Sequence, residues 1–226
     1  MKPEKPSTRV RQKAPKAAAI AGIVFSVLLI VSLSLILISL PANPREGGDW
    51  LSTSRNTILL ALNLVPFTGI AFLWFIGVMR DYLGENEDRF FATVFLGSGL
   101  LFLAMLFSFG ALAGSLILLY LSQTNPLSAS GLYDLGFTTA REILNNYGIK
   151  MAGVFMISTS TLFIRTQAIP RWMALLGYAL AALMLLRVAH IDRLAWPVLG
   201  FPTWVLMISV HILMDNYRKK AEAESL

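Results

Sequence analysis

Histidine and carboxylate side chains are the first candidates for chemistry, because the chain contains two histidines and no cysteine. His211 and Asp215 lie four residues apart in an apolar segment, so a helix would place both on one face. A carboxylate beside an imidazole would make a pH-responsive element at one end of a membrane span. The alternative is that Asp215 lies among lipid headgroups beside Arg218, while His211 hydrogen-bonds to a neighbouring helix.

His190 and Asp192 form a second pair, but a zinc site requires three or four ligands. We interpret both as loop residues at the membrane surface. The chain also lacks the nucleophile elbow G-x-S-x-G, the zinc motif H-E-x-x-H and the Walker phosphate loop. The sequence therefore predicts no catalytic residue, no cofactor or metal site and no enzymatic activity.

Polar side chains inside apolar segments are the remaining candidates for a binding site. Asn63 needs a hydrogen-bond partner in lipid, and Ser158 and Thr161 belong to a run of four hydroxyl residues. Together with His211 and Asp215 they could line a polar pocket. The alternative is ordinary helix packing, in which each hydroxyl bonds to a carbonyl of its own helix.

Gly110 and Gly114 form a G-x-x-x-G motif in another apolar segment. Small residues at this spacing let two helices approach closely, either within one protein or between protomers. We expect helix packing inside the protein, with a homo-oligomer as the alternative.

The composition assigns the chain to the integral membrane class. Of its 226 residues, 56% are hydrophobic and 14% are charged, whereas soluble domains have about a quarter charged residues. The net charge of +6 does not indicate nucleic-acid binding, because residues 1–16 carry six Lys or Arg and one Glu. We expect this tail to be disordered and to lie along anionic lipid headgroups.

Six segments have about the 20 apolar residues that a bilayer crossing requires. They cover residues 17–40, 57–79, 91–121, 146–164, 172–188 and 196–214. The sequence thus predicts an all-α bundle of six transmembrane spans. The third segment is long for one crossing and short for two, so we expect a single tilted or projecting helix.

The distribution of basic residues predicts the orientation of these spans. With six crossings, thirteen Lys or Arg lie on the side of both termini and six on the other side. Both termini are therefore expected in the cytoplasm. The predicted organisation is a basic tail at 1–16, a six-helix transmembrane domain at 17–217 and a short charged tail at 218–226. The connection at 122–145 would be an outer loop, either a plain connector or a short helix at the interface.

Three stretches resemble a known group of proteins: Ile169–Leu180 (I-P-R-W-M-A-L-L-G-Y-A-L), Phe201–Val210 (F-P-T-W-V-L-M-I-S-V) and Val94–Gly99 (V-F-L-G-S-G). They resemble the uncharacterised six-span bacterial membrane proteins that are grouped under domains of unknown function. The resemblance implies a multi-pass protein of the bacterial cytoplasmic (inner) membrane and carries over no site residue. Pro170 and Trp172 are expected to open the fifth span as a helix start and an interface anchor.

Two classes of function agree with these features. The first is a non-enzymatic accessory, assembly or membrane-organising protein with membrane lipids and a membrane protein, or a second copy of itself, as partners. The second is a small permease, channel or lipid-handling protein that uses the pocket near Asn63, Ser158, Thr161 and His211. The scarcity of charge inside the spans favours the first class.

Overall fold

The computed structural model describes residues 8–39, 49–83, 89–122, 131–186 and 196–224. Within these residues every element is a helix, and no strand occurs. The elements are α1 (Thr8–Ser39), α2 (Asp49–Leu83), α3 (Arg89–Ser122), α4 (Gly131–Glu142), η3 (Ile143–Gly148), α5 (Ile149–Thr166), α6 (Arg171–Leu186) and α7 (Trp196–Glu224). The all-α fold predicted from the apolar segments is confirmed.

Five helical stretches are long and apolar enough to cross a membrane. They are Lys16–Ser39, Ser54–Arg80, Phe90–Leu119, Leu135–Thr166 and Val198–Lys219. The sixth, α6, is apolar but has 16 residues, about 24 Å of helix against a hydrocarbon core of about 30 Å. Five helices are therefore long and apolar enough for a multi-pass membrane protein, and the crossing by α6 stays a prediction.

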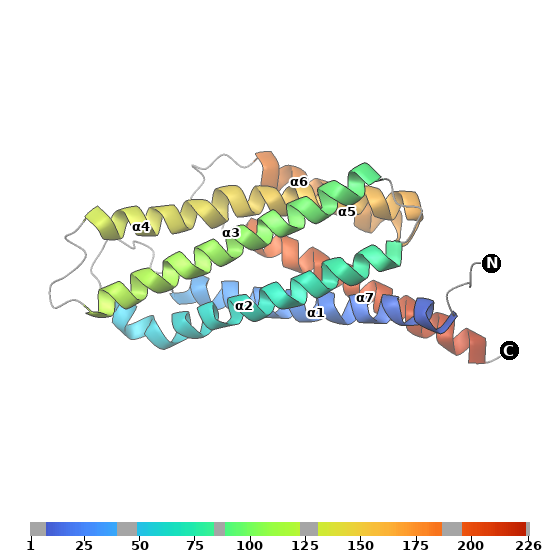
Figure 1. The fold of residues 1–226 in the computed structure, drawn as a ribbon, viewed down its shortest axis with the longest axis horizontal. Coiled ribbons are helices and arrows are strands. Elements are labelled where there is room, and N and C mark those ends of the chain that lie inside the picture. Colours follow the sequence, from blue (N-terminus) through green and yellow to red (C-terminus); the bar gives the residue numbers. More distant parts are fainter. Residues whose placement is uncertain (1–7, 40–48, 84–88, 123–130, 187–195, 225–226) are drawn as a thin grey trace, which may run out of the picture.

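Helix α3 is a single uninterrupted helix of 34 residues, as its apolar sequence predicts. Its length is about 51 Å, well beyond the thickness of the hydrocarbon core. In Figure 1 it runs obliquely to α4 and α5. A tilted course of this kind accommodates a helix that is longer than the bilayer is thick.

The prediction of an outer loop at 122–145 is wrong for residues 131–145, which are helical. Helix α4 passes through η3, a π-helical segment, directly into α5. The short helix expected here therefore exists, but it is continuous with the following span, which begins well before residue 146. A π-helical segment inserts a wider turn without breaking the helix, so the chain keeps its direction.

The helices at both ends extend beyond the predicted spans. Helix α1 begins at Thr8, inside the tail predicted to be disordered, and α7 continues to Glu224 through most of the predicted C-terminal tail. Both extensions are rich in Ala, Lys, Arg, Gln or Glu, which favour helix. Prolonging an existing helix also avoids the unfavourable nucleation step, which explains why the helices do not stop at the membrane boundary.

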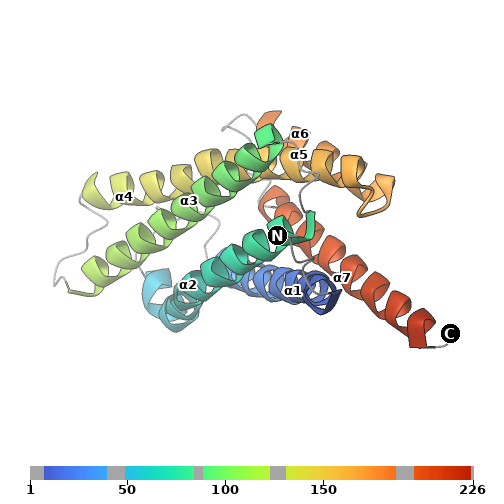
Figure 2. The ribbon, with the colours of Figure 1, turned by 45° about the vertical axis from the view of Figure 1, so that its right-hand side comes forward.

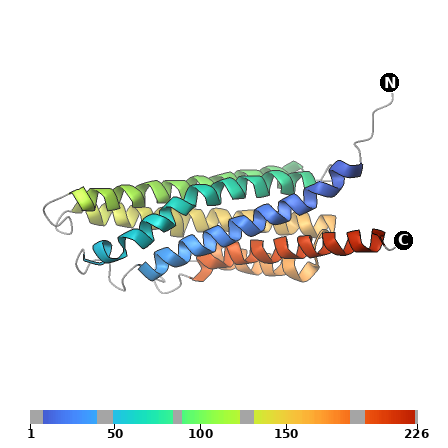
Figure 3. The same ribbon diagram turned by 90° about the horizontal axis from the view of Figure 1, so that it is seen from below.

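The helices form an elongated bundle of two layers. Helix α1 packs along α2 and α7 in one layer, and α5 packs along α3 and α6 in the other (Figures 1 and 2). Figure 3 shows that α1 begins and α7 ends at the same end of the bundle. We call this the terminal end; α5 ends and α6 begins there as well.

The turn between α5 and α6 follows from two residues. Gln167 has a left-handed backbone with φ of 52°, which ends α5. Pro170 stands directly before α6 and its carbonyl accepts a hydrogen bond of 3.1 Å from the backbone N–H of Met173. The prediction that Pro170 opens this helix is confirmed.

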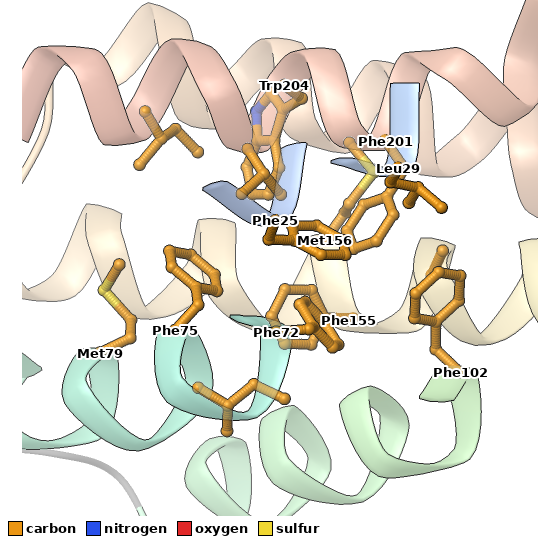
Figure 4. Close-up of a cluster of buried hydrophobic side chains, with 14 of the residues drawn as sticks. Phe25, Leu29, Phe72, Phe75, Met79, Phe102, Phe155, Met156, Phe201 and Trp204 are labelled. Atoms are coloured by element: carbon orange, nitrogen blue, oxygen red, sulfur yellow. The ribbon is translucent and has the colours of Figure 1, made fainter. Parts of the chain in front are cut away.

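Aromatic side chains fill the space between the two layers (Figure 4). The ring of Phe72 on α2 lies 4.4 Å from that of Phe25 on α1 and 5.3 Å from that of Phe155 on α5, measured between centroids. Phe201 of α7 meets Phe72 edge to face at 5.9 Å. These rings are almost completely buried, and they connect helices of both layers into one apolar core.

Candidate functional site

The hydroxyl groups of α5 bond mainly to their own helix. Ser158 Oγ donates to the carbonyl of Val154 at 3.0 Å, and Thr161 Oγ1 donates to the carbonyl of Ile157 at 2.8 Å. The Thr161 hydroxyl also shares a hydrogen bond of 2.7 Å with the Tyr178 hydroxyl of α6. This arrangement is the helix-packing alternative, in which hydroxyls satisfy one another or the backbone.

His211 and Asp215 share one face of α7, as their spacing predicts. The carboxylate of Asp215 makes an ion pair of 2.7 Å with Lys219, one turn further along. Both side chains of that pair are more than one third exposed, and His211 is half-buried. The basic partner of Asp215 is therefore Lys219 at the terminal end of the bundle.

Helix α7 begins at Trp196, which places Pro202 in its second turn and not in its first. His211 is eight residues before Lys219, the last residue of the apolar stretch, or about 12 Å along the helix. Because this apolar stretch has 22 residues, His211 lies nearer to its middle than to its terminal end.

Asn63 lies on the exposed outer side of α2. Ser158 is buried between helices, so the two side chains do not face a common space. The five residues predicted to line one polar pocket therefore separate into an outward amide, two packed hydroxyls and a His–Asp pair in the C-terminal half of α7.

One cavity between the helices is small and apolar. Its volume is about 10 Å³, the space of about one water-sized sphere. Its lining comes from both layers: Leu29, Leu33, Phe102, Leu106, Leu144, Ile149, Ala152, Met184, Val198 and Phe201. None of the five predicted pocket residues contributes to this lining.

Two close helix contacts depend on glycines that sequence reasoning missed. A Cβ atom at Gly22 of α1 would collide with Ser209 Oγ of α7 and the ring of Phe75, and one at Gly177 of α6 would collide with Ser160 Oγ and the indole of Trp204. The only sequence signal was the presence of small residues in apolar helices, which is common to many positions.

Trp204 is held in place by a specific bond. Its Nε1–H donates a hydrogen bond of 3.0 Å to the backbone carbonyl of Met173, and its side chain is buried. Ser32 of α1 similarly donates to the carbonyl of Ala61 on α2 at 2.8 Å. These two bonds join different helices, as does the bond between Thr161 and Tyr178.

The glycines of the G-x-x-x-G motif face α2. A Cβ atom at Gly110 would lie 3.3 Å from Val65, and one at Gly114 would lie 3.9 Å from Leu62. Both glycines thus serve a contact between α2 and α3 inside the protein.

Basic and aromatic side chains meet at the terminal end. The guanidinium of Arg165 lies 4.7 Å from the centroid of the Phe91 ring, and the ammonium of Lys16 lies 5.6 Å from that of Tyr217. Such cation–π contacts tie the start of α1 to the end of α7 and the end of α5 to the start of α3.

Within the described residues no group of three or more His, Cys, Asp or Glu side chains could hold a metal ion. His190 and Asp192 lie outside the described residues.

Comparisons of the chain with models of protein families, with curated proteins and with solved structures find no match.

Proposed function

We propose that this chain is a six-span protein of the bacterial cytoplasmic membrane, with both termini in the cytoplasm. In this membrane it acts as a non-enzymatic accessory, assembly or membrane-organising protein. The single observation that carries the proposed role is the packing of the interior, in which aromatic rings from both layers fill the space between the helices. A solute pathway requires a polar or hydrated route, and the cavity of about 10 Å³ is lined by apolar side chains.

The distribution of basic side chains supports the proposed orientation. Six exposed basic side chains lie at the terminal end: Lys16, Arg80, Arg165, Arg171, Arg218 and Lys219. Toward the opposite end, among the side chains that the structure describes, the basic ones are Arg55 and Arg141, whereas Lys150 lies near the middle of the stretch Leu135–Thr166. An excess of Lys and Arg marks the cytoplasmic side, and the same cations provide binding groups for anionic lipid headgroups.

Thiol labelling tests the proposed role, because the natural chain has no cysteine. Ser158→Cys and Thr161→Cys are treated with a membrane-impermeant maleimide from each side of the membrane. We expect no labelling of either variant, while Arg171→Cys, at an exposed position, reacts from one side. Rapid labelling of Ser158→Cys would reveal a water-filled route and would replace the accessory role by a permease or channel.

A second test uses His211, which the alternative function requires. Under the accessory role, His211→Leu leaves the protein level and any host phenotype intact. Loss of the phenotype at a normal protein level would contradict this role. Purification in native lipid nanodiscs with mass spectrometry then identifies the partner: we expect a reproducible membrane protein, whereas a bound small molecule would favour the permease.

A further inference from the structure

One face of α2 is exposed and carries a regular series of side chains. Its exposed residues alternate at spacings of three and four, and we call them the α2 seam: Leu60, Asn63, Phe67, Ile70, Trp74 and Gly77. Phe67 and Trp74 are 61% and 70% exposed, so the seam presents large apolar groups. Alternating spacings of three and four are those of helices that pair in a left-handed crossing.

Asn63 is the polar member of the seam. The apolar stretch of α2 runs from Ser54 to Arg80, so Asn63 is about 13 Å along the helix from one end and about 25 Å from the other. Its side chain is exposed, and no hydrogen bond joins it to another side chain or carbonyl among the described residues. An amide at this depth faces hydrocarbon unless another molecule supplies a donor and an acceptor.

A second polar group lies beside this amide. Pro66 lies inside α2 and carries no N–H, so the carbonyl of Leu62 lacks the donor that an α-helix normally supplies four residues further on. The nearby hydroxyl of Thr68 donates to a different carbonyl, that of Leu64, at 2.9 Å. Pro66 is itself exposed, so this position lies about one turn from Asn63 on the outer side of α2.

We propose that the α2 seam binds the α2 seam of a second copy of this chain, forming a parallel two-fold dimer in which the two Asn63 amides hydrogen-bond to each other. All copies insert in the same direction, so a symmetric pair of α2 helices is parallel and each seam residue meets its own counterpart. An amide is both donor and acceptor, so Asn63 is complementary to itself.

The remaining seam residues fit the same partner. A Cβ atom at Gly77 would meet nothing within 4 Å, so the surface is open there and two α2 helices can approach closely beside Trp74. Leu60 and Phe67 would pack between the two copies on either side of the amide pair, and Ile70 would pack one turn beyond Phe67. The dimer rests on the membrane-spanning arrangement and not on the accessory role, so either proposal can fail without the other.

Disulfide cross-linking in native membranes tests the dimer. Phe67→Cys and Ile70→Cys, introduced singly into the cysteine-free chain, are oxidised at low expression. The control is Leu175→Cys, because Leu175 on α6 is exposed to a similar extent as Phe67 but lies outside the seam. We expect covalent homodimers for the two seam variants and monomer for the control. Monomer for all three, equal cross-linking of the control, or a cross-link to a different protein would overturn the proposal.

Substitution of the amide tests its role in the dimer. Asn63→Leu should raise the dimer dissociation constant in lipid vesicles by roughly fivefold, whereas Asn63→Gln, which keeps an amide, should stay within roughly twofold of the natural chain. Unchanged expression and an unchanged unfolding temperature of both variants in detergent show that the bundle is intact. Equal dimerisation of Asn63→Leu and Asn63→Gln would overturn the amide pairing.

Discussion

Small side chains at a few positions determine how closely the helices approach one another. Gly177 of α6 lies against Ser160 of α5 and the indole of Trp204 on α7, so three helices meet at one point. Trp204 cannot move aside freely, because its N–H is bonded to the carbonyl of Met173. Gly177 therefore has no free space for a methyl group, whereas Gly97 in the same bundle has such space.

Gly177→Ala is predicted to destabilise the protein by about 1–3 kcal/mol, since the new methyl group overlaps Ser160 Oγ and the Trp204 ring. Gly97→Ala is the matched control, because a Cβ atom there would meet nothing within 4 Å. The control should be neutral or more stable by roughly 0.5–1 kcal/mol, as alanine favours helix. Reversible unfolding in mixed detergent micelles measures both, and equal stability of the two variants would contradict the contact.

At the scale of the elements, the π-helical segment η3 joins α4 to α5. The wider turn lets one helix continue into the next while Ala140 and Leu144 stay buried. Gly136 of α4 lies against Leu116 of α3, so the packing of α4 depends on which of its faces meets α3.

Deletion of Asn146 should convert η3 to a regular α-helix and leave the same face of α4 toward α3, because a π-helical segment accommodates one extra residue within an α-helical path. Ala140 would then keep its buried position. The rate of maleimide labelling at Ala140→Cys in detergent checks this: we expect slow labelling both in the full-length chain and after the deletion. Leu135→Cys, at an exposed position, serves as the control that reacts in both backgrounds. Fast labelling of Ala140→Cys after the deletion would show that η3 does not accommodate an extra residue in this way.

At the scale of the whole molecule, the two ends of the bundle differ in charge. The start of α1, the end of α7 and the turn between α5 and α6 bring exposed cations together, with Trp172 exposed beside them (Figure 3). Amphipathic aromatic rings and basic side chains at one level are typical of a membrane interface on the cytoplasmic side.

The proposed topology predicts that α6 crosses the membrane. Arg171→Cys, before α6, should react with an impermeant maleimide only from the cytoplasmic side, and Leu186→Cys, at its far end, only from the outer side. Leu186 is 79% exposed, so its location permits labelling. Labelling of both variants from the same side would mean that α6 lies in the interface and that the chain has five spans.

Hydrophobic length alone was enough to predict most of the fold. Long apolar runs without charge enter lipid as helices because no water is available there for the backbone, so all five long stretches were found from the sequence. The hairpin at Pro170 was also predictable, since proline acts locally. The candidate pocket was not, because Asn63, Ser158 and His211 belong to different helices whose rotations depend on packing.

By itself, therefore, the sequence determined the membrane class, the helical fold and the concentration of basic residues near the chain ends, which depend on composition and on short stretches. Only the tertiary structure decided that Asn63 faces outward, that Gly177 accommodates Trp204 and that α4 continues into α5. Each of these depends on which face of a helix meets a neighbour. Contacts between residues far apart in the chain determine which face is buried, and a short stretch of sequence does not reveal these contacts.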